Sequence, residues 1–237
     1  MGEALEVARE HVVETQQIVR KRRHLRRLHV RVAGQRDVAG IESFSRLLLD
    51  AGVPVAAAVK VNVAFFEAFG SAGIAALERL RALVPADVPF IADAKRGDIG
   101  PTAERQAVAI FDALGADGVT ASPYLGRDAI EPFLARADRF VYVLCRTSNP
   151  SAAEAQGLSV EGEPLFLRVA RLAAAWSAGN DRIGLVVGAT APAELAQARR
   201  LVGGLAFLVP GVGSQGGDLA AVLEHGPATD PPVGGRR

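Results

Sequence analysis

The chain has 237 residues, of which 49% are hydrophobic and 22% are charged, an ordinary composition for a globular protein. Its formal charge of +1 gives no general argument for a nucleic-acid or membrane partner. The single cysteine, Cys145, excludes an internal disulfide and suits a reducing compartment, and no apolar run is long enough to span a membrane. We therefore expect a soluble, cytoplasmic protein, large enough for one α/β barrel or two small domains.

Apolar, strand-like runs alternate with helix-like stretches from about residue 41 onward. Most of the apolar runs are nearly continuous, which is typical of strands buried on both faces of a parallel sheet. The expected strands are Val53–Val61, Val88–Ala92, Gly118–Ala121, Phe140–Leu144, Ile183–Val187 and Leu205–Val209. The expected helices are Ile41–Asp50, Phe65–Leu83, Thr102–Leu114, Arg127–Ala135, Pro164–Ala178, Pro192–Leu201 and Asp218–His225. This alternation predicts an α/β fold with a parallel sheet.

Polar and glycine-rich residues recur at the carboxyl ends of the expected strands. They include Lys60, the segment Asp93–Asp98, Ser148, Gly188 and Gly211. A (β/α)8 barrel gathers its chemistry from many strands at that rim, whereas an open doubly wound sheet favours one crevice. The pattern therefore favours a (β/α)8 TIM barrel, a fold that typically takes about 250 residues.

The two ends of the chain depart from the barrel pattern. Residues 1–40 form an atypical segment with a dense basic run, Arg20–Arg31, and a doubtful strand near Leu28–Ala33. Residues 226–237 form a tail rich in Pro, Gly and Arg, which we expect to be disordered. We therefore expect a barrel domain over residues 41–225 that is incomplete, with an atypical first strand and no eighth strand.

The segment FIADAKRGDIGPT, from Phe90 to Thr102, carries the strongest functional signal. Its charges interrupt a buried strand, and two carboxylates, Asp93 and Asp98, share one lysine, Lys95. Because residues two apart on a strand point to the same side, Asp93 and Lys95 are expected to project together. A solvated charged loop is the simple alternative for an isolated D-x-K-x-x-D pattern, and the buried strand argues against it.

Further motifs follow around this segment in a fixed order. They are VKVNVAFFEAFG (Val59–Gly70), VTASPYLG (Val119–Gly126), CRTSNP (Cys145–Pro150), GLVVGATAP (Gly184–Pro192) and LVPGVGSQGGD (Leu208–Asp218). Each motif alone is weak, but together with the central segment they resemble the orotidine 5′-phosphate decarboxylase family over about residues 41–220. The resemblance implies a homodimer that decarboxylates orotidine 5′-monophosphate to UMP in pyrimidine biosynthesis, with no cofactor and no metal.

The resemblance also implies roles for particular residues. Lys60, Asp93, Lys95 and Asp98 match the family's alternating Lys-Asp-Lys-Asp catalytic array, with Lys95 as the proton donor. Asp98 matches an aspartate that reaches into the partner subunit's site. The substrate-binding residues implied are Thr102 beside Asp98, Ser148 for the pyrimidine ring, Ile99, Pro210 and Val212 for an apolar pocket, and Gly211, Gly213 and Gln215 for the phosphate-side loop.

Two segments typical of the family have no counterpart in this sequence. The first is a Gly-Leu-Asp-Pro strand end whose aspartate binds the ribose, and Asp37 lies nearby in a different setting. The second is an Asn-x-Ser-Arg-Gly segment whose arginine clamps the phosphate, and neither Arg236 nor Arg237 has that context. Both differences concern the ribose phosphate, so we expect weak substrate binding and little activity, and a catalytically impaired family member is an alternative.

Two other functions fit parts of the sequence. The same barrel superfamily includes sugar-phosphate decarboxylases and aldolases that share the D-x-K-x-x-D core and usually bind a metal. The Ala-Phe-Phe-Glu and Thr-Ser-Asn-Pro segments argue against them. The basic run Arg20–Arg31 could bind the phosphates of a nucleic acid, although it lacks interleaved aromatic residues.

Overall fold

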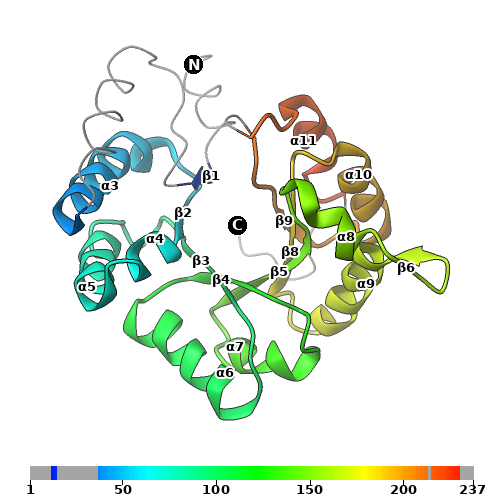
Figure 1. The fold of residues 1–237 in the computed structure, drawn as a ribbon, viewed down its shortest axis with the longest axis horizontal. Coiled ribbons are helices and arrows are strands. Elements are labelled where there is room, and N and C mark those ends of the chain that lie inside the picture. The colour runs from blue at the N-terminus through cyan, green and yellow to red at the C-terminus, as the bar shows by residue number, and fades with distance from the viewer. Residues whose placement is uncertain (1–11, 15–36, 213–214, 230–237) are drawn as a thin grey trace. The chain divides into compact units, whose positions relative to one another are not determined.

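The computed structural model describes residues 12–14, 37–212 and 215–229 (Figure 1). The basic run Arg20–Arg31, the doubtful strand at Leu28–Ala33, Gly213 and the final residues 230–237 lie outside the described residues. The boundaries expected for a central barrel domain therefore stay a prediction.

The described residues fall into two compact units. The first unit runs up to Ala94 and also takes in Val108–Gly118. The second unit takes Lys95–Ala107 and continues from Val119. Strand β3 (Phe90–Arg96) starts in the first unit and ends in the second.

Parallel strand pairing organises the first unit. β1 (Val12–Glu14), which the sequence pattern did not indicate, pairs with β2 (Ala58–Asn62), and β2 pairs with β3. The β2–β3 register sets Asn62 opposite Asp93. The helices of this unit are α3 (Val38–Gly52), α4 (Ala64–Glu67) and α5 (Gly70–Arg81), with a 3₁₀ helix at Val53–Val55 between α3 and β2.

Two elements of the first unit differ from the sequence prediction for local reasons. The expected strand Val53–Val61 begins late, because Pro54 occupies the first turn of the 3₁₀ helix, and proline lacks the N–H that a central strand needs. The expected helix Phe65–Leu83 is two helices, because Gly70 adopts a left-handed φ of 61°.

A polar network fixes the start of β3. Asp117 accepts a hydrogen bond from the Phe90 N–H at 2.8 Å, and the Asp117 N–H donates to the Phe90 carbonyl at 2.8 Å. Arg81 donates to the Gly115 carbonyl at 2.9 Å and to Asp117 at 3.4 Å. Two hydrogen bonds with Asp117 therefore hold the first residue of the strand that carries Asp93 and Lys95.

Strands β4, β5, β8 and β9 organise the second unit. β8 pairs in parallel with β5 on one side and with β9 on the other, and helix α9 packs on β5 and β8. The strands are β4 (Gly118–Ala121), β5 (Phe140–Arg146), β8 (Ile183–Val187) and β9 (Ala206–Leu208). The helices are α6 (Gly100–Ala107), α7 (Glu131–Leu134), α8 (Ala153–Gln156), α9 (Leu165–Ser177), α10 (Pro192–Leu201) and α11 (Leu219–His225).

The second unit also contains elements that the sequence pattern did not predict. A short antiparallel hairpin, β6 (Ser159–Val160) with β7 (Glu163–Pro164), follows α8 (Figure 1). Ion pairs from α9 hold it, Arg168 to Glu161 and Arg171 to Glu163, both at 3.0 Å. The helix after β3 is α6 followed by a π-helical segment rather than one regular helix.

Close packing around β8 explains a buried glycine in its centre. All five residues of β8 are buried. A Cβ on Gly184 would lie 2.5 Å from the Ala206 carbonyl oxygen and 2.9 Å from the rings of Phe140 and Tyr142. Glycine is therefore required there for β8 to approach its two neighbouring strands.

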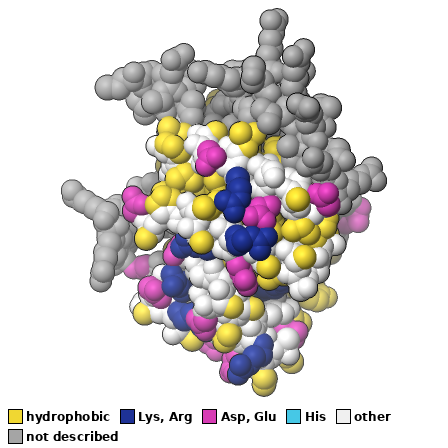
Figure 2. Space-filling view, turned by 90° about the vertical axis from the view of Figure 1, so that its left-hand side faces the viewer, with side chains coloured by type: hydrophobic (Ala, Val, Ile, Leu, Met, Phe, Trp, Pro, Cys, Tyr) yellow, Lys and Arg dark blue, Asp and Glu magenta, His cyan; other side chains and the backbone are white. Residues whose placement is uncertain are grey.

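An ion-pair cluster joins α3 to α5 at the surface of the first unit. Glu42 accepts hydrogen bonds from Arg46 at 2.8 Å and from Arg79 at 3.1 Å. The hydrogen bonds from Arg79 and then Arg46 lower the pKa of Glu42 to about 2. Figure 2 shows acidic and basic side chains mixed on the face where α3 and α5 lie.

We expect Glu42 to make the stability of this unit depend on pH in the acid range. Its folded pKa lies below the unfolded value, so its contribution is full above about pH 4.5 and is lost as pH falls through about pH 2. In urea unfolding, the stability gap between wild type and Glu42→Gln should therefore narrow between pH 7 and pH 3. Asp50→Asn, at an exposed residue of α3, is the control, and an equal gap at both pH values would contradict the prediction.

Candidate active site

A buried ion pair lies between β2 and β3. The Lys60 Nζ is 2.9 Å from the Asp93 Oδ2, and the two residues are only 2% and 8% exposed. The parallel register brings them together, because Asp93 lies opposite Asn62, two residues after Lys60. Burying an ion pair costs about several kcal/mol of desolvation for each ion. A protein in which apolar residues replace such a pair is often equally stable. Folding stability alone therefore does not explain well why the chain has two charged residues at these buried positions.

The continuation of β3 carries Lys95 in an unusual backbone conformation. Lys95 has a φ of 47°, in the left-handed region, and its N–H donates to the hydroxyl of the buried Thr120 at 2.9 Å. Such a φ costs a non-glycine residue about 1–2 kcal/mol. Strand alternation requires extended backbone at both residues, so it does not carry over directly from Asp93 to Lys95. That the two side chains project to the same side stays a prediction.

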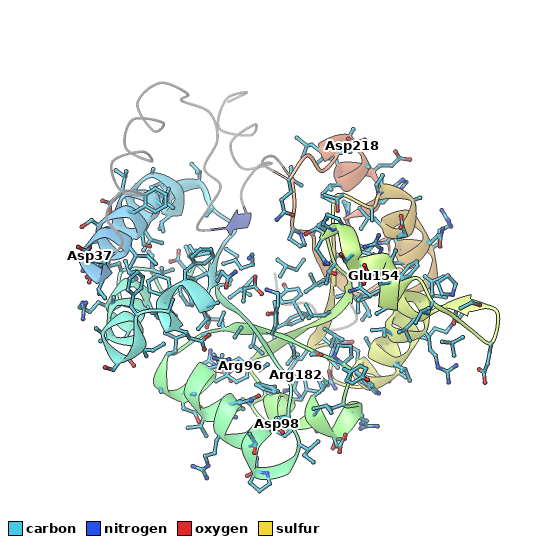
Figure 3. All side chains as sticks on the ribbon, viewed as in Figure 1. Asp37, Arg96, Asp98, Glu154, Arg182 and Asp218 are labelled. Carbon is cyan, nitrogen blue, oxygen red and sulfur yellow. The ribbon has the colours of Figure 1, made fainter. Side chains whose placement is uncertain are left out.

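A tight turn follows Lys95 and leads into α6. The Ser122 N–H donates to the Arg96 carbonyl at 2.7 Å, and a Cβ on Gly97 would lie 3.2 Å from Ser122. The carboxylate of Asp98, labelled in Figure 3, accepts from the Ile99 N–H at 2.8 Å. Ile99 is 55% exposed, and Thr102 lies exposed in the first turn of α6. The turn thus presents one carboxylate, one apolar side chain and one hydroxyl within five residues of chain.

A second group of predicted residues meets at the ends of β5, β8 and β9. The Ala189 N–H donates to the Pro210 carbonyl at 2.8 Å, which joins the loops after β8 and β9. Gly211 has a φ of 100°, and a Cβ there would lie 2.9 Å from the Gln215 Oε1 and 3.3 Å from the Ser148 Cβ. Ser148, Gly211 and Gln215 are therefore neighbours, although they are far apart in sequence.

The remaining predicted residues of this loop are placed as follows. Val212 forms an isolated parallel bridge with Gly217, next to Gln215. Gly213, assigned to the phosphate side, lies outside the described residues. Asp37, the aspartate nearest to the expected ribose-binding position, caps α3 by accepting from the Gly40 N–H at 2.8 Å.

Some residues that support these groups were not identified from the sequence. Thr120 supports Lys95, and it lies in the quoted segment VTASPYLG, but nothing in that pattern indicates a contact with β3. Gln156 and Thr190 contact the loop that carries Ser148. No local pattern marks them, because each contact depends on how separate loops meet.

Cys145 is a core thiol. Its side chain is 2% exposed, donates to the Phe166 carbonyl at 3.1 Å, and has its pKa raised by burial to about 12. At neutral pH it is therefore protonated and is no nucleophile.

Across the described part of the chain, no helix is both long enough and apolar enough to cross a membrane.

Comparisons with known proteins agree on one family. Residues 36–230 match the model of the "Orotidine 5'-phosphate decarboxylase / HUMPS family". The chain is 51% identical to an orotidine 5′-phosphate decarboxylase of Herpetosiphon aurantiacus over 189 residues, 79% of this chain and 71% of that protein. It is also 51% identical to one of Roseiflexus castenholzii over 198 residues, 83% of this chain and 72% of that protein.

Solved structures give the same result at the level of the fold. The structure of Leishmania donovani OMP decarboxylase matches with a TM-score of 0.79 and 37% identity, over 96% of this chain and 83% of that chain. Leishmania donovani UMP synthase matches with a TM-score of 0.80 and 39% identity, over 94% of this chain but 47% of that longer chain. The predicted α/β fold of the TIM-barrel class is confirmed by these likenesses.

We expect single substitutions in the buried pair to be more harmful than their combination. Lys60→Met or Asp93→Leu alone leaves one buried charge without its partner and should destabilise the chain by about 3–5 kcal/mol. The double variant removes both charges and should cost much less than the sum of the two single changes. Urea unfolding of the four proteins measures this difference, and additive losses would show that the pair is not coupled.

Proposed function

The chain belongs to the orotidine 5′-phosphate decarboxylase / HUMPS family, and we propose that it is a carboxy-lyase that converts orotidine 5′-monophosphate to UMP and CO2. The reaction would belong to pyrimidine biosynthesis. It would take place in the cytoplasm, a reducing compartment in which a single unpaired cysteine stays reduced. The observation that carries the proposal is the buried Lys60–Asp93 ion pair at the head of the segment that continues to Lys95 and Asp98.

The chemistry explains why charged side chains are needed. Loss of CO2 from the substrate leaves an anion on carbon 6 of the pyrimidine ring. With no cofactor to accept those electrons, fixed charges of the protein must stabilise the anion. We assign Lys95 as the cation beside that carbon and as the donor of the proton that replaces CO2. Its exposed side chain fits a group that must reach a bound substrate.

Asp93 and Lys60 support the action of Lys95 in this proposal. Asp93 is assigned to the place where the carboxylate of the substrate departs, so that like charge would disfavour the bound ground state. Lys60 contacts Asp93 directly at 2.9 Å and balances its charge. The left-handed backbone of Lys95 is strain of the kind that accumulates at functional positions.

The neutral residues would bind the rest of the nucleotide. Ser148 is assigned to the pyrimidine ring, and its neighbours Gly211 and Gln215 to the phosphate side. Ile99, Pro210 and Val212 would form the apolar wall. Gly211 supports this assignment, because the absence of a side chain there lets Ser148 and Gln215 lie close together.

We further propose that two copies of the chain share their active sites. Asp98 and Thr102 would reach into the site of the partner subunit, as the family resemblance implies. Three large apolar side chains of this turn and of the loop after β4 are exposed: Ile99 is 55%, Tyr124 93% and Leu125 47% exposed. The loop of Tyr124 adjoins the turn through the close approach of Gly97 and Ser122. Such side chains are the usual centre of a protein interface.

Replacement of Lys95 should abolish the reaction. Lys95→Ala removes both the proton donor and the stabilising cation, so kcat should fall by about 10³-fold or more. Loss of orotidine 5′-monophosphate absorbance measures the rate, with EDTA present to separate it from metal-dependent chemistry. Arg105→Ala, at an exposed cation of α6, is the control. Near-normal turnover by Lys95→Ala would rule out the assignment.

Charges placed in the apolar surface should separate the subunits. Tyr124→Asp with Leu125→Asp should convert a dimer to a monomer in light scattering coupled to gel filtration, and activity should fall with it. Leu158→Asp changes a leucine that is 56% exposed elsewhere and should leave the dimer intact. A fully dimeric double variant, or an active monomer, would contradict the shared site.

A further inference from the structure

One glutamine side chain holds the backbone next to Ser148. Gln156, at the end of α8, accepts a hydrogen bond from the Thr147 N–H at 2.8 Å through its Oε1. Its Nε2 donates to the Thr147 Oγ1, also at 2.8 Å. The orientation of the amide is fixed, because a backbone N–H can only donate and must face the oxygen. Gln156 therefore fixes both the backbone and the side chain of Thr147.

The same hydrogen bonds continue across Ser148. The Thr147 hydroxyl, which accepts from Gln156, donates to the Asn149 Oδ1 at 2.6 Å. The residues before and after Ser148 are thus linked to each other and to α8. Figure 3 marks α8 by the labelled Glu154. Helix α8 therefore restrains the backbone on this side of Ser148.

Two contacts from the loop after β8 fix Ser148 on its other side. The Thr190 hydroxyl donates to the Ser148 carbonyl at 2.9 Å. A Cβ on Gly188 would lie 2.8 Å from the Ser148 Cα and 2.9 Å from its Cβ and N, so the two backbones are in direct contact. The half-buried Ser148 is held by α8, by Thr190 and by Gly188, and its own hydroxyl takes no part in these bonds.

We infer that Gln156 is a positioning residue, which acts through Thr147 to hold the Ser148 hydroxyl in place for the pyrimidine ring. This inference rests on the proposed function, because it takes the ring as the ligand of Ser148. Gln156 itself touches no substrate. Its contribution is preorganisation, since a small displacement of a binding group can cost a large factor in rate.

A double-mutant cycle tests this inference on the full chain. Gln156→Leu should lower kcat/KM for orotidine 5′-monophosphate by about 10- to 100-fold. In a Ser148→Ala background the same change should cost no more than about 2-fold, because the group that it positions is already absent. Gln156→Glu keeps the acceptor for the Thr147 N–H but loses the donor to Oγ1, and should fall between wild type and Gln156→Leu. Glu154→Leu, at an exposed residue of the same helix, is the matched control.

Hydrogen exchange gives a readout that needs no activity. The Thr147 amide should exchange faster in Gln156→Leu than in wild type and Glu154→Leu, while the urea midpoint stays unchanged. Unchanged exchange at Thr147, or equal losses of kcat/KM with and without Ser148, would overturn the inference. A wild-type chain without decarboxylation would instead overturn the proposed function, and the exchange result alone would then decide whether Gln156 holds the loop.

Discussion

The buried contact between Lys60 and Asp93 is the constraint on which the candidate active site depends. An ammonium group that is almost fully buried needs an opposite charge within hydrogen-bonding distance, and Asp93 on the neighbouring strand provides it at 2.9 Å. This requirement fixes the register of β2 against β3, since a slip of one residue would turn each side chain to the other face of the sheet. The network of Arg81 and Asp117 fixes the first residue of β3, so the strand is held at its start and at Asp93 in its middle.

The residues proposed to bind the substrate in the second unit are organised by different forces. Around Ser148 the contacts are neutral hydrogen bonds and glycine-to-backbone approaches at Gly188 and Gly211. Neutral contacts of this kind suit recognition of a planar ring and positioning of a phosphate-side loop, whereas buried charge suits stabilisation of an anion. The chain thus separates the chemistry proposed for bond cleavage from that proposed for recognition.

The regular elements were predictable where local pattern and burial agree. β4, β8 and α10 have the predicted bounds, because each is a continuous apolar strand or a helix with a clear proline start. The predicted bounds of β2 and of the helix after it are wrong because a single residue overrides the apolar pattern in each case. Pro54 delays β2 and Gly70 divides the helix after it, while the short strand β1 lacks any distinct periodicity. The left-handed φ of Lys95 could not be expected from a lysine in a strand-like context.

The sequence by itself determined the family, the α/β alternation and the chemical groups of the candidate site, because ordered motifs and apolar runs are local properties of the chain. Tertiary structure decided which carboxylate neutralises Lys60, how the backbone turns at Lys95, and which side chain holds the loop of Ser148. Strand register, loop closure and left-handed backbone depend on contacts between residues distant in sequence. Such contacts leave no periodic pattern in the residues that make them.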